Sequence, residues 1–191
     1  MVKLKVMYSL DKLPSCNFCQ HLTKNRTQVV VGDGELNPSI VFIGEAPGEQ
    51  EDIQGKPFVG RSGTILRNAL SELNITNYYI TNLVKCRPPG NRDPTESESQ
   101  NCFPYLKLQL NKLNPKIICT LGRHSTSKVL SASGKEMKTI TDQRGSEVDI
   151  VIDGKEYILF PMYHPAATIY NQKLKETFIS DLKKLADIAS I

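Results

Sequence analysis

Short apolar runs that end in turns alternate with segments of helical periodicity, and this alternation constrains the fold more than any other feature of the chain. The runs SIVFIGE (39–45), YYITNLVKC (78–86) and KIICTLG (116–122) are typical of buried strands. Helical patterns follow them, at 61–73, 93–113, 124–131 and 174–189. Strands that alternate with helices predict a parallel sheet covered on both faces.

Local signals refine two of these segments. The segment 93–113 begins with PTE after its first residue, a typical helix start, but Pro104 lies inside it. We expect this proline to kink or break the helix, because it lacks a backbone N–H. In VDIVIDGKEYILF (148–160), the dipeptide Asp153-Gly154 separates two β-rich runs and predicts a hairpin.

The size and composition are those of one globular domain, which we expect to span residues 1–191. The chain is 39% hydrophobic, enough for a core, and we find no apolar run of about 18 residues and no signal peptide. We therefore expect no membrane span and a cytoplasmic, nucleoid-associated location. Lys and Arg outnumber Asp and Glu by 24 to 20, a weak indication of a polyanionic partner.

Polar segments follow the strands at the points where a parallel sheet would collect them. The acidic GEAPGEQED (44–52) follows the first strand, Asn82 lies on the second, and YHPAAT (163–168) follows the last. Carboxyl ends of parallel strands meet at one edge, so we expect these segments to share a rim. The GEAPG turn has neither the GxGxxG of dinucleotide folds nor the GK[ST] of a P-loop.

His164 and Phe58 are candidates for direct contact with a ligand at this rim. Pro165 fixes its own φ and restricts His164 to extended backbone, so HPAA presents its imidazole rigidly. A structural histidine at a strand end is the alternative. Phe58, within GKPFVGRSG (55–63), is a candidate for an exposed stacking platform, and a plug in the core is the alternative.

Four of the five cysteines form a candidate metal site. Cys16 and Cys19 are a CxxC pair, whereas Cys86 and Cys102 lie singly among turn residues. Cys119 lies in an apolar strand pattern, typical of a small buried hydrophobe. Four thiolates can hold zinc or a [4Fe–4S] cluster, and the wide spacing of the second pair favours the cluster. Unrelated free cysteines are the third alternative.

Taken together, the motifs resemble those of a known family. GEAPGEQED, GKPFVGRSG, ITNLVKCRPPGNRDPT and YHPAA occur in this order with the four cysteines, and they closely resemble the family 4 uracil-DNA glycosylases. These are the iron–sulfur enzymes of thermophilic archaea and bacteria, and the resemblance runs from about Cys16 to the end of the chain. It implies a three-layer α/β/α sandwich with a central four-stranded parallel sheet.

The resemblance also implies an activity and a cofactor. The expected enzyme is a monofunctional hydrolase that flips uracil out of DNA and cuts its N-glycosidic bond, which starts base excision repair of deaminated cytosine. A [4Fe–4S] cluster with a structural role is implied on Cys16, Cys19, Cys86 and Cys102, with Cys119 outside the pattern.

Four residues are implied to contact the base, namely His164, Asn82, Phe58 and the backbone of Ala46. His164 would donate a hydrogen bond to uracil O2, where negative charge develops as the base leaves. The amide of Asn82 would donate to O4 and accept from N3–H, the opposite of what cytosine offers. Phe58 would stack on the extruded ring, and Ala46 would contact the carbonyl edge.

The resemblance implies that acidic residues of GEAPGEQED act on the sugar during the reaction. A carboxylate there could steady the sugar cation and orient the attacking water, and the motif points first to Glu45 and second to Glu51. We interpret Glu49 and Asp52 as solvated or turn-capping.

Contacts with DNA are expected from basic loops and from the segment after HPAA. Phosphate contacts are predicted for the basic side chains Lys56, Arg61, Lys85, Arg87 and Arg92, with an ordinary solvated surface as the alternative. Ile169 or Tyr170 is expected to fill the gap left by the flipped base. The expected partner is uracil-containing DNA, single- or double-stranded, with a sliding clamp as a further partner and a monomer as the acting form.

Two other classes of protein remain as alternatives. A non-catalytic DNA-binding module with zinc or a cluster would leave Asn82, Phe58 and the strand-end acids without a role. An electron carrier or redox sensor would need neither the His-Pro pair nor the GEAPG turn.

Overall fold

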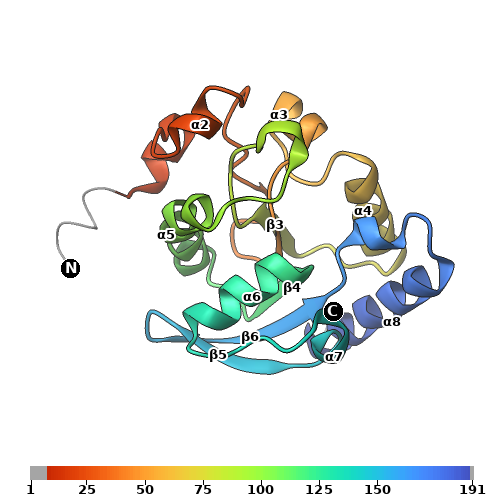
Figure 1. Ribbon diagram of the computed structural model, residues 1–191. Helices are drawn as coiled ribbons and strands as arrows, with labels where there is room; N and C mark the ends of the chain where they lie inside the picture. Colours follow the sequence, from red (N-terminus) through yellow and green to blue (C-terminus); the bar gives the residue numbers. More distant parts are fainter. Residues whose placement is uncertain (1–7, 190–191) are drawn as a thin grey trace.

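The computed structural model describes residues 8–189, and a six-stranded mixed sheet forms its centre (Figure 1). The strands lie in the order β1-β3-β2-β4-β6-β5. Their bounds are Asp33–Gly34 (β1), Ile40–Gly44 (β2), Tyr78–Asn82 (β3), Ile117–Leu121 (β4), Val148–Ile152 (β5) and Lys155–Met162 (β6).

The four central strands are parallel, which confirms the sheet predicted from the alternating pattern. β2 lies between β3 and β4, β6 pairs with the other side of β4, and all three pairings are parallel. β1 and β5 add one antiparallel strand at each edge. The two-residue strand β1 has no apolar run, so the sequence pattern gave no sign of it.

Helices cover both faces of this sheet. Their bounds are Gln20–Thr23 (α2), Glu49–Gln54 (α3), Arg61–Glu72 (α4), Glu96–Leu113 (α5), Arg123–Ala132 (α6), Ile140–Gln143 (α7) and Gln172–Ala189 (α8), with short 3₁₀ helices at Leu10–Ser15 (η1), Pro89–Asn91 (η2) and Pro165–Thr168 (η3). α5 and α6 pack on one face, and α4 and α8 on the other (Figure 1).

The burial of the strands explains this layering. Val41 and Ile43 of β2 belong to the core under α5 and α6, whereas Ile40 and Phe42 belong to the core under α4 and α8. All four side chains are fully buried. Successive residues of a strand point to opposite faces, so a wholly apolar strand requires cover on both sides. The predicted three-layer sandwich is confirmed.

Two local predictions have different outcomes. Asp153 and Gly154 join β5 to β6 with φ values of 51° and 80°, as a two-residue hairpin turn requires. Pro104, in contrast, does not break α5, which continues from Glu96 to Leu113. A capping box formed by Thr95 and Glu98 stabilises the N-terminus of this helix.

Among the described residues, no helix is long and apolar enough to cross a membrane.

Candidate active site

The carboxyl ends of the parallel strands bring the predicted residues to one rim. Gly44 at the end of β2 is paired with Asn82 at the end of β3. Gly122 directly follows β4, and a Cβ added to it would lie 3.1 Å from the Cβ of His164, which follows β6. Segments that are far apart in the sequence therefore meet at this edge, as the parallel sheet predicts.

Two of the predicted base contacts, Asn82 and Phe58, lie next to Gly44, and a third, His164, lies next to Phe58. A Cβ at Gly44 would lie 2.3 Å from the side-chain oxygen of Asn82 and 2.6 Å from the ring of Phe58. The ring centroid of Phe58 lies 5.7 Å from that of His164, with the planes tilted by 37°. A side chain at position 44 would collide with Asn82 and Phe58. The GEAPG motif therefore begins with glycine because the site has no room for a larger residue.

Phe58 is buried, not exposed as the stacking interpretation expected. Its side chain is only 5% exposed and its backbone has a φ of 54°, in the left-handed region that disfavours side chains. Such a conformation costs on the order of 1–3 kcal/mol, so the surrounding structure must hold it in place. A base could reach only a limited part of this ring.

Two side chains from the flanking helices hold the Phe58 loop. The guanidinium of Arg67 in α4 donates to the carbonyls of Phe58 and Pro57, both at 2.9 Å. The carboxylate of Glu51 in α3 accepts from the backbone N–H of Val59 at 2.9 Å and of Gly60 at 2.7 Å. Glu51 is 8% exposed, so both hydrogen bonds are shielded from water.

The acidic residues after β2 therefore differ in their surroundings. Glu51 lies in α3 and ties the Phe58 loop, and the buried carboxylate of Asp52 accepts from the backbone N–H groups of Thr27 and Gln28. Glu49 is exposed and lies 3.4 Å from Arg87. Asp52 is thus buried and not solvated, and it caps backbone N–H groups of an N-terminal loop, in line with the alternative of a turn-capping acid.

His164 is held as a neutral hydrogen-bond donor. The backbone N–H of Ala166 donates to its Nδ1 at 3.2 Å, so the proton of the neutral ring resides on Nε2. Burial lowers the pKa of His164 to about 4, and the nearby carboxylate of Glu51 opposes this shift. The HPAA segment thus fixes the position of the ring and also its tautomer.

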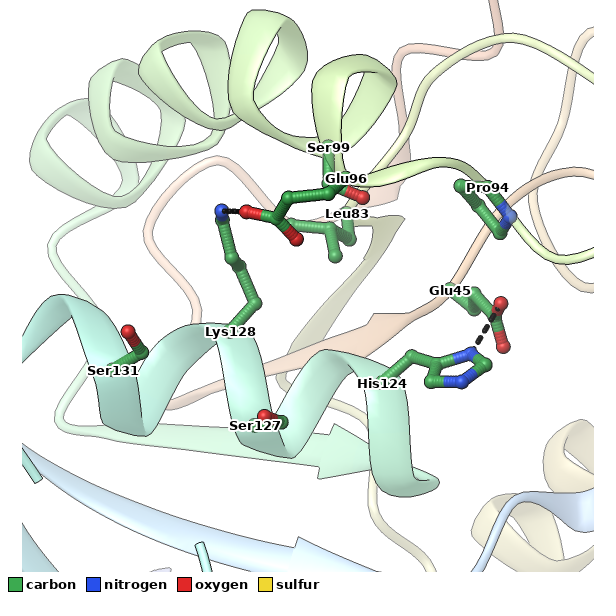
Figure 2. A pocket seen from close by; sticks show the side chains of 9 residues that line it. All are labelled: Glu45, Leu83, Pro94, Glu96, Ser99, His124, Ser127, Lys128 and Ser131. Carbon is green, nitrogen blue, oxygen red and sulfur yellow. Dashed lines mark hydrogen bonds and ion pairs between the residues drawn. The ribbon is translucent and has the colours of Figure 1, made fainter. Parts of the chain in front are cut away.

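Glu45 has a partner that the sequence did not reveal. Its Oε1 lies 2.5 Å from Nδ1 of His124, in the first turn of α6 (Figure 2). Both residues line a cavity of about 200 Å³ between the start of α5 and α6. From sequence, His124 was only the expected first residue of a helix, and 79 residues separate it from Glu45. No local pattern could have paired them.

The four candidate ligand cysteines lie in one region of the core formed by the N-terminal segment, the loop after β3 and α5. Cys86 and Cys102 are buried, and burial raises the pKa of Cys102 to about 12. Cys102 lies inside α5, within the helix predicted over 93–113, although its neighbours are typical of turns. Cys119 is fully buried in β4, as predicted for a small hydrophobe.

Several N–H groups point at the sulfur atoms of this region. The guanidinium of Arg26 donates to Cys86 at 2.8 Å, and the amide of Asn101 donates to Cys19 at 3.7 Å. The backbone N–H of Lys85 donates to Cys102 at 3.3 Å. Donors of this kind stabilise thiolates that bind a metal centre.

The prediction that Lys85 contacts DNA is wrong. Its side chain is fully buried, and its Nζ donates to the Thr81 hydroxyl and to the backbone carbonyl of Asn82, both at 2.6 Å. Burial lowers the pKa of Lys85 to about 8, while the thiols of Cys102 and Cys86 oppose this shift. Lys85 therefore connects the cysteine region to the strand end that carries Asn82.

The other predicted DNA contacts occupy varied positions. Arg61 and the 87%-exposed Tyr170 lie together, with a 2.8 Å hydrogen bond and the guanidinium 4.9 Å from the ring centroid. Ile169 is half-buried and Lys56 is exposed. Arg92 is engaged by both oxygens of Glu98, which leaves it less free to meet a phosphate.

Fold and site together define a class of protein, and a family model supports the same class. The model described as the uracil DNA glycosylase superfamily matches residues 31–185. The chain is 45% identical to a type-4 uracil-DNA glycosylase of Sulfurisphaera tokodaii, over 96% of this chain and 86% of that protein. Similar relatives named type-4 uracil-DNA glycosylase occur in Archaeoglobus fulgidus (39% identical, 95% and 94% covered) and Thermotoga maritima (41%, 91% and 89%).

The chain belongs to the uracil DNA glycosylase superfamily and, within it, to the type-4 uracil-DNA glycosylases. The family predicted from the motifs is confirmed.

Proposed function

We propose that this protein removes uracil from DNA by hydrolysing the N-glycosidic bond. The observation that carries the proposal is the arrangement of Asn82 and Phe58 beside Gly44, with His164 next to Phe58, at the strand ends where α/β proteins bind ligands. Membership of the type-4 family supports the same activity. The base must leave the helix to reach these side chains, since they are mostly buried.

His164 stabilises the departing base in this proposal. As the C1′–N1 bond breaks, its electron pair moves onto the uracil, and negative charge builds at O2. The Nε2–H of a neutral, immobile imidazole donates to that oxygen, and the bond strengthens as the charge grows. Removal of a donor of this kind costs on the order of 10²–10³ in rate.

Asn82 distinguishes uracil from cytosine. Its buried amide at the end of β3 can donate to O4 and accept from N3–H of uracil. Cytosine offers an amino donor and a bare N3 acceptor, so the amide would face like groups at both positions. An unpaired buried polar group costs about 1–3 kcal/mol, which favours uracil by roughly one to two orders of magnitude for each mismatch.

Glu45 acts on the sugar side of the base. The leaving uracil takes the bonding electrons, so C1′ acquires positive charge that a carboxylate stabilises. Water then attacks C1′, the new C–O bond forms, and the water's proton passes to a carboxylate oxygen of Glu45 and on to solvent. Glu45 is half-buried after β2, one residue beyond the glycine that contacts Asn82 and Phe58.

Cys16, Cys19, Cys86 and Cys102 are proposed to hold a [4Fe–4S] cluster, which would supply a rigid cross-link and no redox step. The N–H groups aimed at the sulfurs of Cys86 and Cys102 support anionic thiolates, which a cluster requires.

The proposal can be tested with matched oligonucleotides that carry uracil, thymine or cytosine at one position. After incubation with the protein, alkali should break the strand only at the uracil position, and the Glu45→Gln and His164→Ala variants should slow this release while retaining DNA binding. Binding without strand breakage by the intact protein would contradict the proposal and favour a non-catalytic DNA-binding module.

A further inference from the structure

Glu45, whose carboxylate acts in the proposed reaction, contacts His124. His124 lies in α6, a helix that has no other role in the proposed reaction. Glu45 follows β2 and His124 lies in the first turn of α6, and their side chains point toward each other across the cavity edge (Figure 2). The 2.5 Å separation of Oε1 and Nδ1 is short for a nitrogen–oxygen hydrogen bond. Both side chains are about one-third exposed or less, so the contact is partly shielded from water.

The surroundings of the second ring nitrogen determine where the proton lies. Nε2 of His124 is 2.8 Å from the guanidinium of Arg123 and 3.6 Å from a carboxylate oxygen of Asp93. If Arg123 donates to Nε2, the ring is neutral and its proton is on Nδ1. If Nε2–H instead faces Asp93, the ring is a cation with protons on both nitrogens. In both arrangements Nδ1–H donates to Glu45.

We propose that His124 is a positioning residue for Glu45, an inference that rests on the proposed function. By binding Oε1, the imidazole restricts the rotation of the carboxylate and keeps Oε2 available for C1′ and the attacking water. Within the described part of the chain, Oε2 has no hydrogen-bond partner, which is consistent with an oxygen reserved for substrate.

His124 takes no proton in this scheme. The proton released by the attacking water goes to Oε2 of Glu45, while the Nδ1–H···Oε1 bond persists throughout the reaction. The donor thus contributes geometry. A freely rotating glutamate loses rotamer freedom when it is fixed for the reaction, and His124 fixes it before substrate arrives.

The test compares three variants by single-turnover uracil release and by DNA affinity. His124→Ala removes the donor and should slow release on the order of 10-fold or more, with little change in the dissociation constant for uracil-containing DNA. His124→Asn places an amide N–H near the position of Nδ1–H and should restore much of the rate. Glu136→Ala, a change at an exposed residue in the loop after α6, is the control and should leave the rate unchanged.

A double variant shows whether His124 acts through Glu45. If it does, adding His124→Ala to Glu45→Gln should slow release no further than Glu45→Gln alone. Additive losses, or an equal loss in His124→Asn and His124→Ala, would overturn the inference. A wild-type protein that releases no uracil refutes the proposed function itself, whereas an active wild type with an equally active His124→Ala variant refutes only the role of His124.

Discussion

At the scale of single residues, the surroundings of His164 determine what its imidazole can do. An accepting Nδ1 and a partly buried ring leave one donor, Nε2–H, and no positive charge near neutral pH. A neutral donor is suited to a uracil anion because it need not lose a proton to the departing base. The local sequence HPAA predicted a rigid imidazole, but the tautomer depends on the N–H of Ala166, which only the folded turn places.

The protonation of His164 can be measured directly. We expect its NMR ring signals to remain those of the Nε2–H tautomer from pH 8 to pH 5, because burial lowers its pKa from 6.5 to about 4. The unfolded chain binds this proton first, so His164 should lower the free energy of unfolding as the pH falls from about 6.5 to about 4. A titration midpoint near 6.5 for His164 would contradict the assignment.

At the scale of elements, the short helix α3 and the Phe58 loop form one unit held by Glu51. The carboxylate accepts two backbone N–H groups of the loop, and the loop in turn holds Phe58 in the left-handed region. The resemblance to the family offered Glu45 and Glu51 as candidate acids, and the structure gives them different surroundings.

Two substitutions distinguish a structural Glu51 from a catalytic one. Glu51→Gln keeps an oxygen that can accept both N–H groups and should retain most of the rate of uracil release. Glu51→Ala leaves two N–H groups unpaired, at about 1–3 kcal/mol each, and should slow release and reduce stability. Measured rates and denaturation midpoints that fall equally in both variants would show that the charge of Glu51 itself is needed in the reaction.

The helices and strands show which parts of the fold could be predicted from the sequence. Apolar strands, helix starts and the Asp153-Gly154 hairpin are local patterns, and the parallel sheet and its two-sided cover follow from them. Lys85 was misplaced because its polar neighbours suggested a surface loop, whereas its side chain is fully buried. Contacts between distant segments, such as Glu45 with His124, have no local signature and required the folded chain.

At the scale of the whole molecule, Lys85 connects the two functional regions. Its backbone N–H donates to Cys102 and its ammonium group donates to the carbonyl of Asn82, so the proposed cluster and the proposed base reader share one residue. Thiolates that hold the proposed cluster would also favour a buried cation at Lys85, because an opposite charge offsets part of the desolvation cost.

Replacement of this lysine should affect both regions. Lys85→Met keeps the length of the side chain but leaves the Thr81 hydroxyl and the Asn82 carbonyl without their donor. We expect a loss of about 1–3 kcal/mol in the free energy of unfolding, together with slower uracil release. Denaturation curves measure the change in the free energy of unfolding, and the absorbance of the purified protein near 400 nm reports on the proposed cluster. Unchanged stability would refute the link, and the exposed Lys135→Met is the matched control.

The most direct test of the account is a crystal structure of the protein with free uracil. We expect the base at the rim formed by the ends of β2, β3 and β6, with O2 within hydrogen-bond distance of Nε2 of His164 and its O4 and N3 edge on the amide of Asn82. Uracil bound elsewhere, or an imidazole that presents Nδ1 to the base, would contradict the account.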